Sequence, residues 1–469
     1  MSKIATSPVR WGRRLLLGLG AFVLVIVLAY GVAFISTGHS QLARTIVWLD
    51  SDVDDIDRFP SRAIESSTAS EIPEALDGAT AAAFGRLDPA LGGTGDIDTF
   101  LTDTESTALL VLRDGVLVHE WYAEGIDRET LQTSFSVSKS FLSTLIGIAI
   151  DDGSISSLED PITDYVPELL ERDTRFSTIT LKNLITMSAG LAYSEEKTLW
   201  GDGAKTYYSP DLRSTALTAV IEEAPGQTWL YNNYNPLLLG MVLERATGQS
   251  VTDYMGDVLW GPLGAGADAS WSLDSNASGF EKMESGLNAR AIDFARFGLM
   301  ASRGGLVDGE QIVSQQWIED ATAVDITSNP DAHYQYFWHV YPTAENFAEI
   351  DPARVPQGDP QGEPRFDPQG EPLPAPPGED AGVPLGDDGA APFGDADSGP
   401  QGDDIGMMLQ SRVADFSAEG NFGQMIYVAP NEDTVIVRLG RSYADTYWPG
   451  LLGALAHELG PVDALRGTP

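Results

Sequence analysis

The sequence predicts an α+β fold, and three observations lead to that class. Two pairs of strand-like runs, at residues 107–125 and 426–440, lie far apart in the chain. A long apolar segment at residues 136–152 has helical spacing instead. A shorter apolar segment, residues 448–459, follows the second pair of strands and predicts a closing helix. Strand and helix patterns therefore occupy separate stretches of the chain, as they do in α+β proteins.

Each pair of strand-like runs contains a turn signal. Asp114-Gly115 divides the first pair, and Asp-Gly between such runs is a strong signal of a β-hairpin. The turn of the second pair falls at residues 430–433. The segment at residues 136–152 is apolar almost all around the helix, and Gly153 supplies a stop signal at its end. We therefore expect two hairpins and one buried central helix.

Composition excludes several classes of function. Of the 469 residues 28 are basic and 69 are acidic, and a net charge of −41 repels nucleic acid. A high-salt habitat is one explanation for this charge, and a single acidic tract that inflates the count is the other. The chain has no cysteine, which excludes disulfides and thiolate catalysis, and its five histidines show no metal-binding spacing. We expect neither a metal nor another cofactor.

The N-terminal region has the pattern of a membrane anchor. Residues 15–36 contain no charged side chain and are long enough to span a bilayer. Basic residues, among them Arg13 and Arg14, precede this run, and acidic sequence follows it from Asp50. By the positive-inside rule, residues 1–14 form a cytoplasmic tail and the rest of this single-pass membrane protein lies outside the cytoplasm. A cleaved signal peptide is the alternative.

The rest of the chain divides into a stalk, a globular domain and an insertion. Residues 37–80 are polar and acidic and predict a stalk, whereas residues 81–350 and 406–462 predict the globular domain. Residues 351–405 are rich in proline, glycine and acidic residues, with repeated Pro-Gln-Gly units. Such a composition buries too little apolar surface to offset the entropy of ordering. We expect a disordered insertion that acts as a solvated spacer or, alternatively, binds a partner.

The first turn of the central helix carries the first candidate catalytic residues. Ser136 and Lys139 are three residues apart, so they share one face of the helix. Free backbone N–H groups at a helix N-terminus can bind an oxyanion. Burial and the positive end of the helix both disfavour a charged amine, and a neutral Lys139 can take the proton from Ser136 and make it a nucleophile. A lysine that reaches solvent is the alternative.

A second motif lies in the segment at residues 225–240. Tyr231 can transfer a proton when a lysine is near, and Asn233 can hold a lysine or a substrate carbonyl. The alternatives are a tyrosine in the core and an asparagine that caps a helix.

A third motif precedes an apolar strand. Gly420 and Gly423 flank the start of that strand, and glycines there let a substrate lie close to the strand edge. A backbone N–H at Asn421 can supply a second oxyanion donor. A plain bulge or loop before an edge strand is the alternative.

The order and local context of these motifs resemble those of the serine hydrolases related to class C β-lactamases and penicillin-binding proteins. Within that family the chain is most similar to the branch of 6-aminohexanoate-oligomer hydrolases and related esterases. The resemblance covers residues 81–345 and 407–459. Supporting stretches lie at residues 179–193, 285–300 and 312–322.

The resemblance implies a role for each motif. Ser136 is implied as the nucleophile, Lys139 as the general base and Tyr231 as the proton donor to the leaving group. Asn233 is implied to position the lysine or the substrate, and the amide of Asn421 is implied to complete the oxyanion hole.

The resemblance also implies the architecture. The family's fold is a mostly antiparallel sheet with helices on both faces, beside an all-helical lobe that residues 155–300 would form, with the active site between the lobes. This chain departs from the family at the third motif. β-Lactamases and transpeptidases carry a Lys or His with a Thr or Ser before the glycine, where this chain has Ala418-Glu419. The departure argues against penicillin turnover and favours the amide and ester hydrolase branch.

The sequence therefore predicts a membrane-anchored, extracytoplasmic serine hydrolase that cleaves an ester or amide of a small molecule through an acyl-enzyme. One alternative is a D-alanyl peptidase or β-lactam-reactive protein of the cell envelope. The other is a non-catalytic, surface-tethered binding protein on the same fold. Several aromatic side chains are expected either to line a cleft or to pack in the core: Trp200, Tyr207, Tyr208, Tyr336 and Trp338.

Overall fold

A computed structural model describes the chain in eight stretches. The described residues are 17–22, 40–66, 70–87, 95–194, 198–324, 331, 333–341 and 414–461. The predicted insertion at residues 351–405 lies outside them, as does the predicted membrane segment apart from residues 17–22. Among the helices of this described part, none has the length and apolar composition needed to cross a bilayer.

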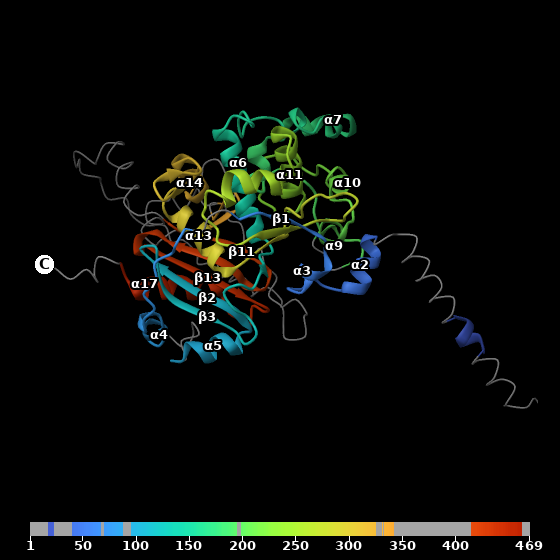
Figure 1. Ribbon diagram of the computed structural model, residues 1–469. Helices are drawn as coiled ribbons and strands as arrows, with labels where there is room; N and C mark the ends of the chain where they lie inside the picture. The colour runs from blue at the N-terminus through green and yellow to red at the C-terminus, as the bar shows by residue number, and fades with distance from the viewer. Residues whose placement is uncertain are drawn as a thin grey trace, which may run out of the picture. The chain divides into compact units, whose positions relative to one another are not determined.

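The largest element of the fold is a seven-stranded antiparallel sheet with the strand order β3-β2-β13-β12-β11-β10-β9 (Figure 1). Its strands are β2 (Ser106–Arg113), β3 (Val116–Tyr122), β9 (Tyr334–Gln335), β10 (Trp338–Tyr341), β11 (Asp415–Gly420), β12 (Gln424–Ala429) and β13 (Thr434–Gly440). Both predicted hairpins are confirmed, because β2 pairs with β3 and β12 pairs with β13. Segments from far apart in the chain therefore build one sheet.

Helices cover both faces of this sheet, which explains why every residue of β2 is buried. Leu110 and Leu112 belong to the core under α6 and α13, whereas Leu109 and Val111 belong to a second core under α4, α5 and α17. These helices are α4 (Ala79–Phe84), α5 (Ile97–Asp103), α6 (Val137–Asp151), α13 (Ala291–Ser302) and α17 (Trp448–Leu459). Alternate residues of one strand thus serve two cores, as the pleat requires.

A mostly helical region follows α6 and lies on one side of the sheet (Figure 1). Its helices are α7 (Glu168–Arg172), α8 (Leu181–Ile185), α9 (Asp202–Tyr208), α10 (Leu212–Ala216), α11 (Tyr234–Thr247) and α12 (Val251–Met255). The structure differs from the predicted all-helical lobe at residues 155–300, because two strands lie near its end. A second sheet has the order β1-β5-β6-β4. Its strands, β1 (Ser61–Ile64), β4 (Gln132–Thr133), β5 (Ala269–Ser272) and β6 (Leu287–Ala289), are too short for a clear period-2 pattern.

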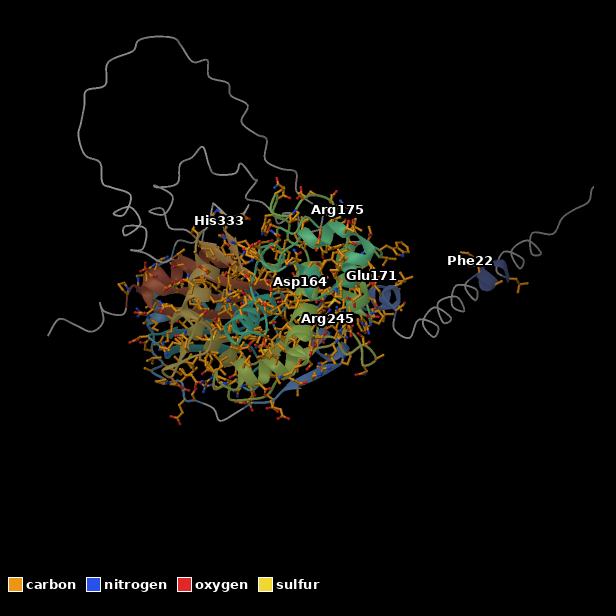
Figure 2. All side chains as sticks on the ribbon, turned by 90° about the horizontal axis from the view of Figure 1, so that it is seen from above. Phe22, Asp164, Glu171, Arg175, Arg245 and His333 are labelled. Atoms are coloured by element: carbon orange, nitrogen blue, oxygen red, sulfur yellow. The ribbon has the colours of Figure 1, made fainter. Side chains whose placement is uncertain are left out.

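The surface of the helical region carries charged side chains. The exposed residues Asp164, Glu171, Arg175 and Arg245 lie over it in the view from above (Figure 2). Arg245 on α11 pairs with Glu168 on α7 at 2.8 Å. Exposed pairs of this kind add little stability, so the apolar core beneath them holds the helices together.

The strands on either side of residues 342–413 are neighbours in the large sheet. β10 ends at Tyr341 and β11 begins at Asp415, and these two residues are paired across the strands. The chain therefore leaves and re-enters the sheet at one point. The entropic cost of closing a loop rises only slowly with the length of the loop, so additional residues are tolerated at this position.

The N-terminal part of the fold differs from the prediction of a stalk at residues 37–80. This segment contains α2 (Gln41–Trp48), α3 (Asp55–Arg58) and β1, and β1 pairs with β5. Trp48 and Phe59 pack against each other and against Tyr208 on α9. The polar composition suggested a stalk, but a few aromatic side chains and one ladder of backbone hydrogen bonds fix the segment beside α9 (Figure 1).

Candidate active site

The turn before α6 presents Ser136 at the N-terminus of a buried helix. Ser136 is the N-cap residue and is half-buried. The preceding Phe135 has a φ of 45°, in the left-handed region that bulky residues rarely adopt. Its buried ring packs against that of Phe422, with the centroids 5.3 Å apart. This packing holds a strained turn and thereby fixes the direction of Ser136.

Lys139 contacts Ser136 directly. Its Nζ lies 2.8 Å from Ser136 Oγ and also donates a hydrogen bond of 2.8 Å to the backbone carbonyl of Glu284. The Lys139 side chain is only 1% exposed, which excludes the alternative of a lysine that reaches solvent. A base within hydrogen-bond distance of a hydroxyl can take up its proton when the hydroxyl attacks.

Tyr231 lies beside Lys139, with the centre of its ring 4.8 Å from Lys139 Nζ. The neighbouring Asn232 fixes the loop: its buried side chain donates to the carbonyl of Leu191 at 3.1 Å and accepts from the N–H of Tyr234 at 2.8 Å. The structure thus brings the three predicted catalytic side chains together. Asn232 was missed in the sequence, because a single polar residue before a helix carries no signal of burial.

Asn233 occupies the N-cap position of α11, but its side chain makes no capping hydrogen bond. Its Nδ2 donates to the hydroxyl of Tyr193 at 3.0 Å. Its Oδ1 is buried and has no hydrogen-bond partner among the described residues. An amide oxygen in this state can accept an N–H group from a substrate. The predicted contact of Asn233 with a substrate stays a prediction.

The end of β11 lies against the turn that carries the nucleophile. A Cβ atom at Gly420 would be 2.3 Å from the carbonyl oxygen of Ser134 and 3.1 Å from the amide nitrogen of Ser136. No side chain fits there, so glycine is what lets the two backbones approach each other. Asn421 follows Gly420 directly, which brings its amide next to the turn where the oxyanion hole is predicted.

Gly423 has a packing role behind this strand end. Its φ is 74°, and a Cβ atom there would lie 2.6 Å from the guanidinium of Arg438 and 2.9 Å from the ring of Trp448. The buried Arg438 guanidinium is stacked 4.0 Å from the Trp448 ring. The structure therefore explains Gly423 by the space that this pair occupies, and its contact with a substrate stays a prediction.

The aromatic residues noted in the sequence pack mostly in the interior. Trp200 is 66% exposed, whereas Tyr208, Tyr336 and Trp338 are buried and Tyr207 is half-buried. Tyr207 packs against Phe59 and Tyr208, and Trp338 stacks on Phe297. For most of these residues, packing in the core is the interpretation that the structure supports.

A group of possible metal ligands lies at the opposite end of β11 from Gly420. Asp415, Glu432 and His457 offer ligand atoms within 4.8 Å of one another. The Nε2 atom of His457 is 3.2 Å from Asp415, and its Nδ1 atom is 2.9 Å from Glu432. Because each ring nitrogen faces its own carboxylate, this is the geometry of an ion-paired imidazolium. The hydrogen bond to Asp415 contributes most to raising the pKa of His457 to about 9.

The chemistry available at the first site is attack of a hydroxyl on a carbonyl carbon. Ser136 supplies the oxygen, Lys139 can accept its proton, and backbone amides at Ser136 and Asn421 can stabilise an oxyanion. This makes the protein a serine hydrolase by class, with a lysine in the place that histidine occupies in the Ser-His-Asp triad.

The family of the chain is shown by comparison with known proteins. A protein-family model described as Beta-lactamase matches residues 96–443, and the chain belongs to that family. A relative of this chain, the 6-aminohexanoate-dimer hydrolase of Paenarthrobacter ureafaciens, is 29% identical over 256 residues. The match covers 51% of this chain and 62% of that protein, so it spans less than two thirds of the relative.

Solved structures share the fold. A Bacillus anthracis protein described as a 6-aminohexanoate-dimer hydrolase aligns with a TM-score of 0.59 and 19% identity, over 88% of this chain and 92% of that one. A class C β-lactamase aligns with a TM-score of 0.50 and 16% identity, over 83% of this chain and 97% of the other. The predicted family and the predicted β-lactamase-like α+β fold are confirmed.

Proposed function

We propose that this protein hydrolyses an amide or ester bond of a small molecule through an acyl-enzyme. The observation that carries the proposal is the 2.8 Å distance between Lys139 Nζ and Ser136 Oγ at the N-terminus of α6. The ring of Tyr231 beside the same amine and the close approach of Gly420 to the Ser136 turn add to it.

Acylation follows from these positions. Ser136 Oγ attacks the carbonyl carbon while the uncharged Lys139 takes the hydroxyl proton. The carbonyl oxygen gains the negative charge, and the amides of Ser136 and Asn421 bind it. Tyr231 gives a proton to the leaving amine or alcohol as its bond to carbon breaks, and Lys139 returns a proton to Tyr231. Water then attacks the Ser136 ester and gives a proton to Lys139. Lys139 passes that proton to Ser136 Oγ as the ester bond breaks, which releases the acid and restores the serine hydroxyl.

The preferred substrate is an amide other than a β-lactam. Glu419 stands where β-lactamases carry a Thr or Ser, and its carboxylate accepts hydrogen bonds from Ser417 Oγ, at 2.8 Å, and from the hydroxyl of Tyr341. A negative charge on this strand disfavours the carboxylate that every penicillin carries. The name of the Paenarthrobacter ureafaciens relative, 6-aminohexanoate-dimer hydrolase, makes the 6-aminohexanoate dimer the first compound to test.

The test compares the full chain with its Ser136→Ala variant. A fluorophosphonate probe should label the protein at Ser136, and the protein should hydrolyse the 6-aminohexanoate dimer and a short p-nitrophenyl ester. Equal rates for the two proteins would contradict the catalytic assignment and favour a binding protein. Labelling of Ser136 by a fluorescent penicillin at low concentration would favour the D-alanyl peptidase alternative instead.

We also propose that residues 15–36 anchor the protein in the cell membrane with the hydrolase domain outside the cytoplasm. The uncharged run and the basic residues before it support this placement. Protease added to intact cells should degrade the domain, and the protein should stay with membranes washed in alkaline carbonate. A mature protein whose mass lacks the N-terminal segment would instead identify a cleaved signal peptide.

A further inference from the structure

The segment at residues 40–64, which we call the N-terminal strap, contacts both halves of the catalytic machinery. It precedes residues 96–443, which the family model matches. One contact of the strap reaches Asn421 at the end of β11. Another places the ring of Phe59 4.5 Å from Lys282 Nζ, two residues before Glu284, whose carbonyl binds the amine of Lys139. A segment that only connected an anchor to a domain would need neither contact.

Ser51 of the strap holds the side chain of Asn421. Asn421 Nδ2 donates to Ser51 Oγ at 3.1 Å, and Asn421 Oδ1 accepts from the backbone N–H of Phe422 at 3.2 Å. Both polar ends of the Asn421 side chain are thus engaged, which restricts its rotamer and the orientation of its backbone. The amide of Asn421 comes directly after Gly420, whose backbone lies against the Ser136 turn. Ser51 therefore acts on the amide that we assign to the oxyanion hole.

The strap also encloses the charged pair behind the catalytic lysine. Asp55 accepts a hydrogen bond of 2.6 Å from the hydroxyl of Tyr207. The rings of Tyr207 and Phe59 lie 3.8 Å and 4.5 Å from Lys282 Nζ, and Lys282 pairs with Glu284 at 2.7 Å. The backbone carbonyl of Glu284 is the one that accepts from the catalytic lysine. The strap thereby shields the Lys282–Glu284 ion pair from water, and this pair positions the backbone carbonyl of Glu284.

The strap is itself firmly attached. β1 pairs with β5 over four residues, from Ser61 to Ile64. The buried Arg44 donates to the carbonyl of Asp274 at 2.7 Å, and the hydroxyl of Tyr208 donates to the carbonyl of Leu49 at 2.9 Å. With its ends held by the helical region, the strap can present Ser51 to β11 in one fixed place.

We propose that the N-terminal strap is a part of the active site and that Ser51 is a positioning residue for the oxyanion-binding amide of Asn421. This inference rests on the proposed acyl-enzyme mechanism. Ser51 touches no reacting atom, and its effect passes through the Asn421 side chain. An oxyanion donor acts only in the transition state, so displacing it lowers kcat and leaves substrate binding almost unchanged.

The test is Ser51→Ala in the full chain, with Ser66→Ala as the matched control. Ser66 Oγ also makes a hydrogen bond with a distant side chain, here as the donor to Asp268 at 2.8 Å, but it lies on the exposed surface. We expect Ser51→Ala to lower kcat about tenfold with an unchanged KM and an unchanged melting temperature, because a small displacement of a catalytic group has a large kinetic effect. Ser51→Thr, which keeps the hydroxyl, should restore kcat to within about twofold.

Three outcomes separate the possibilities. A kcat of Ser51→Ala equal to that of Ser66→Ala would overturn the inference, even if hydrolysis depends on Ser136. A fall in kcat of Ser51→Ala that is accompanied by an equally large rise in KM would also overturn it. So would a fall in kcat that Ser51→Thr does not restore. Hydrolysis that survives Ser136→Ala would instead contradict the proposed function itself, so the two failures are distinguishable.

Discussion

Two buried lysines lie on either side of Glu284, and they differ in what they contact. Lys139 and Lys282 are each 1% exposed. Lys139 Nζ contacts a serine hydroxyl and the backbone carbonyl of Glu284. Lys282 Nζ contacts the carboxylate of the same residue at 2.7 Å and lies 3.8 Å from the ring of Tyr207. Glu284 therefore binds Lys139 through its backbone carbonyl and Lys282 through its side-chain carboxylate.

Burial of a lysine therefore does not by itself indicate a role in catalysis. Burial lowers the pKa of Lys282, while the carboxylate of Glu284 counters the shift by favouring the charged amine. No hydroxyl nucleophile is among the hydrogen-bond partners that the structure gives for Lys282, which are Glu284 and the carbonyl of Tyr207. Lys139, by contrast, reaches a hydroxyl at a helix N-terminus. We therefore assign catalysis to Lys139 and stability to Lys282.

The first prediction concerns the role of Lys139 in catalysis, and its expected effect on activity is the largest. Lys139→Met should lower kcat/KM for the amide about 10,000-fold, because the base that takes the Ser136 proton is lost. The half-exposed Lys205, which pairs with Asp202, gives the matched control: Lys205→Met should leave the rate unchanged. Initial rates of amide hydrolysis measure both. A Lys139→Met rate above one tenth of the wild-type rate would remove Lys139 from the mechanism.

The second prediction separates the same lysines by stability. Lys282→Met leaves the buried Glu284 carboxylate without its cation, and breaking a buried pair in this way costs about 3–5 kcal/mol. The double variant Lys282→Met with Glu284→Gln should recover much of that loss, since the remaining charge is removed. Urea unfolding measures both free energies. A single variant as stable as the wild type would show that Lys282 is not the stabilising member of this comparison.

The helix and the hairpins could be predicted because their signals are local. The apolar run after Ser136 and the turn at Asp114-Gly115 each lie within one short segment, and so does the Ser136–Lys139 spacing. Tyr231 needed the family resemblance, since its distance from Lys139 is set by tertiary packing. The side chain that meets Lys139 from outside its own helix cannot be derived from spacing.

The strap and the Glu284 carbonyl could not be predicted, for a different reason. Ser51 lies 370 positions from Asn421, in a polar stretch with no periodic pattern. The carbonyl of Glu284 is a backbone group, and the residue type at a position does not indicate what its backbone carbonyl binds. Phe135 also carries no sequence signal, because its positive φ is imposed by packing on Phe422. Contacts between segments that are distant in the chain therefore cannot be predicted from these sequence patterns.

The third prediction concerns the hydroxyl of Tyr231, the residue beside Lys139. Tyr231→Phe keeps the ring next to Lys139 Nζ and removes only the hydroxyl. An amine leaves poorly without a proton, whereas p-nitrophenolate leaves readily without one. We expect the amide rate to fall about 100-fold and the p-nitrophenyl ester rate to fall much less. Equal losses on the two substrates would show that Tyr231 does not protonate the leaving group.

The last prediction concerns His457, a half-exposed histidine that pairs with Asp415 and Glu432 at the far end of β11. The pKa of His457 is raised to about 9 by Asp415 and Glu432, above the unfolded value of about 6.5. Its stabilisation is therefore fully present below pH 6.5 and is lost as the pH rises through 9. Because the His457 side chain is 50% exposed, solvent screening limits the effect to about 1 kcal/mol. Urea unfolding of the wild type and of His457→Gln should differ at pH 6 and converge above pH 9. A difference that persists at pH 10 would mean that the histidine contributes by packing and not by charge, in contrast to Lys282.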